Sequence, residues 1–207
     1  MFLLLSTNHN FLFIHVPKTG GNSIQRVLLP FSDDRMVADR PHHDGINRFE
    51  IVSDTLGLRK HATLEDYRKR LHPDVFRRLT KIACVRNPWD RCASFFFSPH
   101  RGSVSWSPEI FEDFIRTEVH PHSRYLALTP DQQAGSPFDH VDVVLRFERL
   151  AEDFSSLCER LEIGRTKLPR INVSQREDYR SYFTTSRLID LVADRFAPEI
   201  ARFNYDF

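Results

Sequence analysis

Short continuous runs of apolar residues alternate along the chain with segments whose apolar positions recur at helical spacing. The run at 11–16 is continuously apolar and rich in β-formers, so it predicts a buried parallel strand, and the runs at 81–85 and 141–145 predict two further strands. A segment that predicts a helix follows each run. The first helix is expected at 24–29, the second after Arg91 and through Phe97, and the third from Leu150 to Leu161. This alternation predicts an α/β fold with a mostly parallel β-sheet flanked by helices.

Polar residues at particular positions predict where further helices begin. Thr63 and Asp66 resemble a capping box, so we expect a helix from there towards Leu71. Ser107 followed by Pro108 predicts the start of another helix. Its buried stripe would be Ile110, Phe111, Phe114 and Ile115, and a last helix would bury Leu188, Leu191, Val192 and Phe196. Residues 31–60 are polar and irregular and predict loops with one short strand near 49–52.

Composition narrows the class of protein. A chain of 207 residues with 41% hydrophobic residues fits one domain, residues 1–207, and can bury a core without a disulfide or a metal. Eighteen phenylalanines argue against disorder. The formal net charge of +1 argues against a nucleic-acid-binding protein, because that class carries a large basic excess. An anion site in this chain would therefore be local.

The cysteines and the N-terminus bear on the cellular compartment. Three cysteines without C-x-x-C spacing suggest neither a disulfide framework nor a zinc ribbon, and favour a reducing environment. The N-terminal apolar run has four residues and no basic flank, so it does not predict a signal peptide, and no segment is long enough to span a membrane. We expect a soluble, cytoplasmic protein.

The loop after the first strand carries the chemistry of an anion site. Gly20 and Gly21 are adjacent in a protein with only seven glycines, and without Cβ atoms their amides could approach a phosphate at the start of the next helix. Lys18 adds a cation, and Thr19, Asn22 and Ser23 add short donors. The alternative is a tight turn before a helix. The loop is not a Walker A sequence, because its lysine precedes the glycines.

Two motifs resemble those of a known family. The segment 17–23 resembles the 5′-phosphosulfate loop of sulfotransferases that use 3′-phosphoadenosine-5′-phosphosulfate (PAPS), especially the carbohydrate 2-O-sulfotransferase-like branch; Asn22 stands where threonine or serine is usual. The segment 85–94 resembles the family's 3′-phosphate motif, with Arg86 after a strand and Ser94 in the next helix. The alternative for Arg86 is an ion pair with Asp90, and for Ser94 a helix hydroxyl with an internal partner.

The resemblance implies a P-loop-like fold and a function. PAPS would be the sulfate donor and adenosine 3′,5′-bisphosphate the product, with no metal required. The acceptor would be a hydroxyl of a carbohydrate or small glycoconjugate. Lys18 would neutralise charge on the leaving group, and the amides of Gly20 and Gly21 would fix the phosphate. The resemblance extends over 144–150 and the C-terminal region but not over 31–55 and 98–107, where we expect acceptor loops.

An acceptor hydroxyl must lose a proton, which requires a base. His61 is the candidate, because the catalytic histidine of 2-O-sulfotransferase-like enzymes lies in a similar place before the 3′-phosphate motif. The alternative is a surface histidine near a helix N-terminus, with Glu65 and Asp66 as reserve bases. We expect His15, in mid-strand, to be a buried core residue. The cluster His42, His43 and Asp44 lacks a partner at ligand spacing, so we expect no metal site.

Local charge agrees with an anionic cofactor. Residues 59–91 contain ten basic and four acidic residues. Five of them, Arg68, Lys69, Arg70, Arg77 and Arg78, form either a solvated helix face or a surface for a sugar polyanion. Two other functions remain open: a nucleotide-dependent kinase of related fold, and a non-catalytic binder of nucleotides or anionic glycans. The sequence leaves the oligomeric state undetermined.

Overall fold

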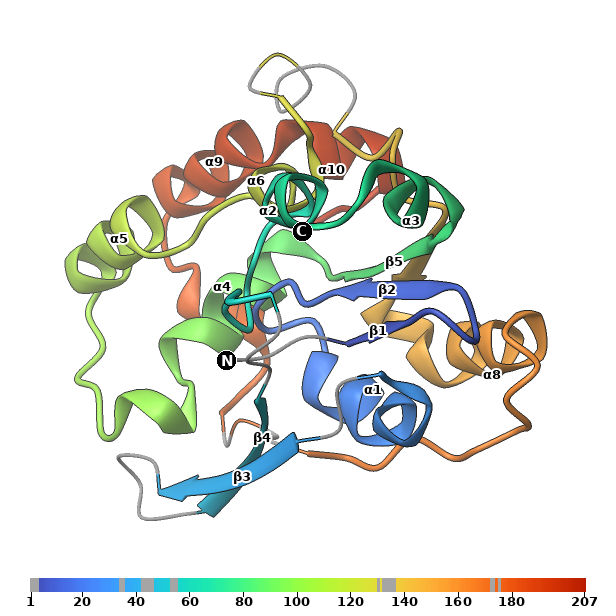
Figure 1. Cartoon of the computed structure of the whole chain (residues 1–207). Helices are drawn as coiled ribbons and strands as arrows, with labels where there is room; N and C mark the ends of the chain where they lie inside the picture. Colours follow the sequence, from blue (N-terminus) through green and yellow to red (C-terminus); the bar gives the residue numbers. More distant parts are fainter. Residues whose placement is uncertain are drawn as a thin grey trace.

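The protein folds around a four-stranded sheet (Figure 1). The computed structural model describes residues 4–33, 56–129, 131, 137–171, 174 and 176–207, and the backbone of 36–41 and 47–52. The strands lie in the order β1 (Leu5–Ser6), β2 (Phe11–Ile14), β5 (Thr80–Val85) and β6 (Val143–Arg146). β1 pairs antiparallel with β2, whereas β2, β5 and β6 are parallel. The predicted α/β fold with a mostly parallel sheet is confirmed and is consistent with a P-loop-like fold.

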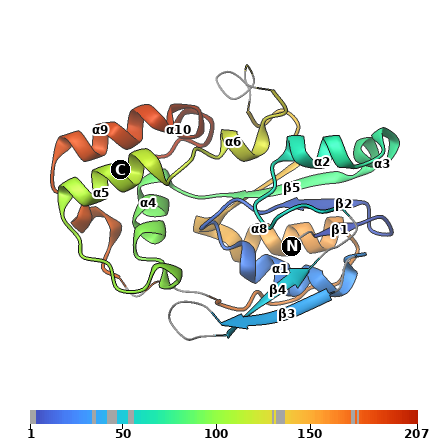
Figure 2. The same ribbon diagram turned by 60° about the vertical axis from the view of Figure 1, so that its left-hand side comes forward.

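Helices cover both faces of this sheet (Figure 2). On one face, α1 (Gly21–Leu28) and α8 (Leu150–Arg160) pack against Phe11 and Phe13. Leu12 and Ile14 alternate with these phenylalanines and belong to the core on the opposite face. The remaining helices are α2 (Leu64–Arg70), α3 (Pro73–Arg78), α4 (Pro88–Phe96), α5 (Pro108–Thr117), α6 (Ser123–Leu126), α9 (Ser186–Arg195) and α10 (Ala197–Phe203). Burial on both faces explains why the strands have continuous apolar sequences.

The predicted capping residues start their helices as expected. At α2, Thr63 Oγ1 accepts from the Asp66 amide at 3.1 Å while Asp66 Oδ2 accepts from the Thr63 amide at 2.8 Å. This is a complete capping box, which satisfies two otherwise unpaired backbone donors. Ser107 caps α5 in the same way, by accepting from the Ile110 amide at 3.2 Å. The local sequence therefore fixes where these helices begin.

Several boundaries differ from the sequence-based expectations. The expected short strand near 49–52 is part of β4 (Asn47–Val52), but it pairs with β3 (Met36–Pro41), which was expected to be loop. α1 begins at Gly21 rather than at residue 24. Ile110 is 49% exposed and not buried, because it lies at the edge of the stripe formed by its neighbours on α5.

The C-terminal region contains one helix more than the sequence predicted. Phe196 ends α9, and Pro198 lies in the first turn of the separate helix α10. Short 3₁₀ turns occur at Leu29–Phe31, Pro99–Arg101, Phe147–Arg149 and Tyr179–Tyr182. None of the helices in the part of the chain that the structure describes has the length and apolar character needed to cross a bilayer.

Candidate functional site

The loops that follow β2, β5 and β6 meet at one edge of the sheet. These three strands are parallel neighbours, so their carboxyl ends lie on the same side, where α/β proteins bind ligands. The loop after β2 carries Lys18, the loop after β5 carries Arg86, and the turn after β6 carries Phe147. Arg86 Nη1 donates to the Lys18 carbonyl oxygen at 3.0 Å. The two loops singled out by the sequence are therefore in direct contact.

The first loop leads into α1 through a left-handed backbone conformation. Lys18 has φ +66° and Gly20 has φ +83°, both in the left-handed region. Gly20 is the N-cap of α1, with no side-chain cap, and the first turn of the helix contains no acidic residue. The first-turn amides and the helix dipole together favour an anion at this position.

The two glycines are also required for packing inside the protein. A Cβ on Gly20 would lie 2.8 Å from Leu150 Cδ2. A Cβ on Gly21 would lie 2.2 Å from both Cδ2 and Nε2 of His15. We expected the missing Cβ atoms to make room for a phosphate, but their positions are filled by the protein's own side chains. The His15 ring and the start of α8 thus hold the loop from within.

Arg86 and Ser94 lie together, as the second motif suggested. Arg86 is 7% exposed, and its Nη1 donates to Ser94 Oγ at 3.1 Å as well as to the Lys18 carbonyl. Its guanidinium lies over the Phe147 ring, with Cζ 3.8 Å from the ring centroid. Arg86 Nε donates to Asp90 Oδ2 at 2.7 Å, so the ion pair considered as an alternative also forms. These contacts use Nε and Nη1, and within the described part of the chain Nη2 is the remaining nitrogen of the guanidinium.

A second arginine shares the Asp90 carboxylate. Arg176 Nη2 donates to Asp90 Oδ1, while Oδ2 accepts from Arg86. Burial lowers the pKa of Arg86, while Asp90 raises it and the nearby charge of Arg176 lowers it. Two guanidinium groups thus share one carboxylate beside Ser94, and the charge of Glu148 also acts on Arg86. No sequence motif pointed to Arg176, which lies far from Arg86 along the chain.

The other residues of the first loop have distinct environments. Lys18 Nζ donates to Ser98 Oγ at 3.1 Å, which places the ammonium beside the end of α4. Thr19 is fully buried, and its hydroxyl donates to the Val16 carbonyl at 2.9 Å. Ser23 is buried and Asn22 is partly exposed. The Thr19 side chain therefore has a structural partner, so only its backbone amide is suited to a ligand.

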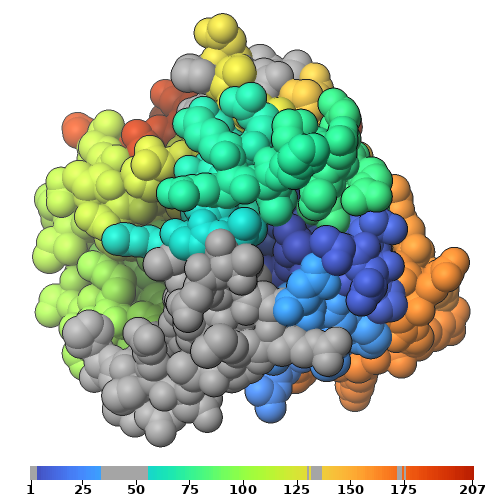
Figure 3. All heavy atoms as spheres, viewed as in Figure 1, coloured from blue at the N-terminus to red at the C-terminus, as the bar shows by residue number. Residues whose placement is uncertain are grey.

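His61 lies next to the start of the first loop. Its Nδ1 is 2.8 Å from the His15 carbonyl oxygen, and the two imidazole rings meet edge to face with centroids 4.7 Å apart. A carbonyl oxygen only accepts, so Nδ1 carries the proton and Nε2 keeps its lone pair. In the space-filling view, the segment that carries His61 borders the N-terminal strands (Figure 3). A neutral imidazole with Nε2 unprotonated is the form required of a base.

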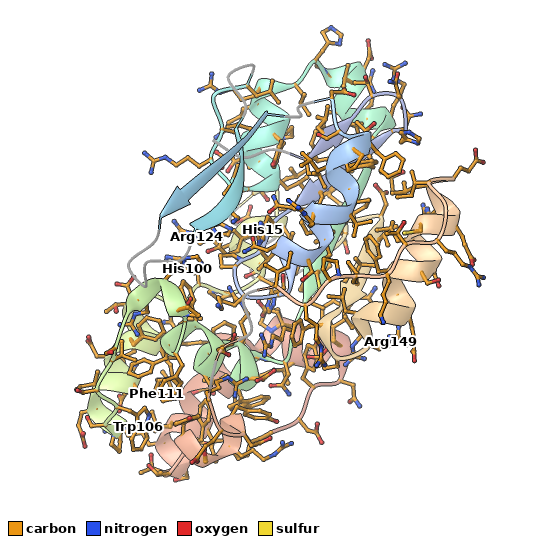
Figure 4. All side chains as sticks on the ribbon, turned by 90° about the horizontal axis from the view of Figure 1, so that it is seen from below. His15, His100, Trp106, Phe111, Arg124 and Arg149 are labelled. Carbon is orange, nitrogen blue, oxygen red and sulfur yellow. The ribbon has the colours of Figure 1, made fainter. Side chains whose placement is uncertain are left out.

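The surroundings of His61 favour its neutral form. Although His61 is exposed by surface area, the surrounding chain desolvates its ring and lowers its pKa to about 4. The hydrogen bond to His15 opposes this shift, whereas the charges of Lys60, Arg91 and Lys18 add to it. His15 is 5% exposed, as expected of a core residue (Figure 4), and burial lowers its pKa well below the usual range.

The alternatives named from the sequence have local roles. Asp66 is committed to the capping box, and Glu65 Oε1 pairs with Lys69 Nζ at 2.8 Å. His42, His43 and Asp44 lie outside the described residues. Among the described residues, no group of three or more His, Cys, Asp or Glu side chains could hold a metal ion. Five basic side chains are exposed as expected, namely Arg68, Lys69, Arg70, Arg77 and Arg78.

Sequence reasoning missed a set of buried residues behind the two loops. Arg91 is fully buried, with Nε donating to the Pro17 carbonyl at 2.9 Å. His122 accepts a hydrogen bond from the Arg86 amide at 3.3 Å, and Glu199 lies beside His122. Glu199 is on α10, a helix that the sequence did not predict. The charge of Arg91 was visible in the sequence, but nothing local indicated that it is buried.

Comparison with known proteins agrees with the resemblance seen in the two loops. The chain matches the model of the sulfotransferase family over residues 3–206. This span includes both loops, all the elements described above and α10. Neither a curated protein nor a solved structure gave a match.

The contact between Gly21 and His15 predicts a specific instability. Gly21→Ala should lower the free energy of unfolding by about 1–3 kcal/mol, because the new methyl group must displace a buried ring. Urea denaturation measures the free energy of unfolding. The substitution Gly21→Ala should cost less stability in the His15→Ala background than in the wild-type protein, because the ring that the methyl group would displace is then absent. Additive effects of the two substitutions would contradict the packing explanation.

Proposed function

The chain belongs to the sulfotransferase family, and on that premise we propose that it transfers the sulfuryl group of PAPS to a hydroxyl of a carbohydrate or small glycoconjugate. A single domain, residues 1–207, carries the activity in this proposal. The donor supplies the activated sulfuryl group and leaves as adenosine 3′,5′-bisphosphate. The residues of this chain bind the two ends of the donor, neutralise the leaving group and remove the acceptor's proton.

One observation carries the proposal: the Arg86 guanidinium joins the two loops. Nη1 donates both to the Lys18 carbonyl at 3.0 Å and to Ser94 Oγ at 3.1 Å. A donor with phosphate groups at its 5′ and 3′ positions needs two anion sites in a fixed relation. The contact between the loops supports such a relation before any ligand binds, which reduces the entropy lost on binding.

The donor groups fit two phosphate groups. At the first loop, the amides of the α1 N-terminus, at Gly20, Gly21 and Asn22, would bind the 5′-phosphate. At the second, Arg86 Nη2 and the Ser94 hydroxyl would bind the 3′-phosphate, with Arg176 adding positive charge. A planar guanidinium stacked on an aromatic ring is held in orientation, so it can direct its remaining N–H groups at phosphate oxygens.

Lys18 and His61 would perform the chemical step. Lys18 neutralises charge that grows on the bridging oxygen as the sulfur–oxygen bond breaks. His61 Nε2 accepts the proton of the acceptor hydroxyl, whose oxygen forms the new bond to sulfur. The positive charge of Lys18 acts on the His61 imidazole, so the two groups lie within electrostatic reach of each other. That proximity supports a single reaction centre.

The acceptor would enter beside Lys18. Ser98, which accepts from Lys18 Nζ, begins the segment 98–107 that the two motifs do not account for. Loops carry specificity in enzymes whose scaffold holds the chemistry. This segment is therefore the proposed acceptor loop, and a panel of hydroxyl-bearing glycans and glycosides incubated with PAPS and read by mass spectrometry would identify the acceptor.

The proposed donor site predicts selective nucleotide binding. Adenosine 3′,5′-bisphosphate should raise the melting temperature far more than AMP at equal concentration, since only the bisphosphate reaches Arg86. Arg86→Ala should remove most of that preference, because a hydrogen bond to a charged group contributes about 1.5–3 kcal/mol. Equal stabilisation of the wild-type protein by both nucleotides would rule out a 3′-phosphate site at Arg86.

Substitution of Lys18 should separate catalysis from binding. Lys18→Ala is expected to lower turnover about 100-fold or more, with a smaller change in bisphosphate affinity, because the ammonium acts on charge that develops in the transition state. Steady-state kinetics and calorimetric titration measure the two effects. Arg26→Ala, on the exposed side of α1, is the matched control. An equal loss in both measurements would reduce Lys18 to a binding residue.

His61 should give activity a distinctive dependence on pH. Only neutral His61 accepts a proton, and its pKa of about 4 in the free protein means that kcat/KM should rise through pH 4 and be level near neutrality. A bound anionic donor favours the imidazolium, so the rise in kcat should lie at a higher pH. His61→Asn should bind bisphosphate normally but lose roughly 100-fold to 10,000-fold in rate. A rate near that of the wild type would move the search to Glu65 and Asp66.

A further inference from the structure

A buried polar cluster lies behind the two loops that carry Lys18 and Arg86. It has no part in the proposed chemistry. Its members are Arg91 on α4, His122 and Ser123 at the start of α6, and Glu199 on α10. Arg91, His122 and Glu199 have no exposed surface. A carboxylate, an imidazole and a guanidinium are costly to bury together, so their place in the core requires an explanation.

His122 lies between Glu199 on α10 and the backbone of Arg86. His122 Nε2 is 3.3 Å from the Arg86 backbone nitrogen, whose N–H must be the donor. Nε2 therefore has no proton, and Nδ1 carries it. Nδ1 lies 3.5 Å from Glu199 Oε1, near enough for electrostatic attraction but without a hydrogen bond, and Oε1 accepts from the Ser123 amide at 3.3 Å. The negative charge of Glu199 lies close to the protonated Nδ1, so it favours the tautomer that can accept from Arg86.

Arg91 fixes the same turn to the first phosphate loop. Its Nε donates to the Pro17 carbonyl at 2.9 Å, and its Nη1 donates to the His120 carbonyl at 2.8 Å. The turn 120–123 is consequently attached to the loop after β2 through Arg91 and to the loop after β5 through His122. Glu199, which is remote in sequence, attaches this turn to the C-terminal helix.

A purely structural role does not explain the polarity of the cluster. Three of its atoms, Glu199 Oε2, Arg91 Nη2 and His122 Nδ1, are buried without a hydrogen-bond partner among the described residues. Apolar side chains of similar size would fill the same space without that cost. What apolar side chains could not do is accept the Arg86 amide and thereby fix the backbone from which the guanidinium extends.

We propose that His122 and Glu199 are positioning residues for the 3′-phosphate site. His122 fixes the Arg86 backbone, Glu199 fixes His122, and the pair sets how strongly the protein prefers a nucleotide with a 3′-phosphate. Neither residue touches the donor. The inference rests on the proposed function, because it takes Arg86 as the ligand of the 3′-phosphate.

The test compares nucleotide preference among variants of the full chain. The quantity measured is the ratio of the dissociation constants of AMP and adenosine 3′,5′-bisphosphate, by calorimetric titration. His122→Phe fills the space but cannot accept from Arg86, and should lower the ratio about tenfold, since it leaves a buried donor unpaired. His122→Gln offers a carbonyl oxygen near the position of Nε2 and should restore most of the preference. Glu199→Gln, which keeps the shape, should lower it by an intermediate factor.

Two reference variants separate the possible outcomes. Val192→Ala removes buried volume on α9 and should lower the melting temperature without changing the ratio. An unchanged ratio in both His122→Phe and Glu199→Gln, while Arg86→Ala abolishes the preference, would overturn the positioning role. If His122→Phe does not fold, Glu199→Gln alone decides between these results. If Arg86→Ala itself keeps the preference, the proposed 3′-phosphate site is wrong and this inference falls with it.

Discussion

The guanidinium of Arg86 is the group on which the arrangement of the candidate site depends. It is nearly buried, and a buried cation must be surrounded by acceptors to remain charged. Asp90, Ser94 and the Lys18 carbonyl supply them, and Phe147 lies against its face. These partners come from three segments: α4, the loop after β2 and the turn after β6. Satisfying one cation therefore fixes the relative positions of the loops that follow all three parallel strands.

Contacts inside the protein also fix the loop after β2, which carries Lys18 and the two glycines. The loop is left-handed at Gly20, His15 packs closely against Gly21, and the N-terminus of α1 has no side-chain cap. The loop is thus held by the core beneath it, and its amides are oriented without a ligand. A site organised in this way pays little reorganisation energy when charge develops during a reaction.

Electrostatics also link the proposed catalytic pair. Burial is the main cause that disfavours the imidazolium form of His61, and the charges of Lys60, Arg91 and Lys18 add to it, while the His15 carbonyl accepts the proton on Nδ1. In the proposed function, cations that would attract the anionic donor would also help to keep the nearby imidazole neutral. One cluster of positive charge can serve both donor binding and proton abstraction.

The sequence by itself determined the features that depend on neighbours along the chain. The strands at 11–16 and 81–85, the capping box at Thr63 and the two loops around Lys18 and Arg86 were predicted because apolar periodicity, side-chain caps and glycine pairs act locally. Tertiary structure decided the rest. The pairing of Arg86 with Arg176 through Asp90 and the burial of Glu199 beside His122 join residues far apart in sequence, and the contact of His15 with Gly21 depends on the fold of the loop between them. No local pattern encodes these contacts, since they exist only when the sheet brings the ends of its parallel strands together.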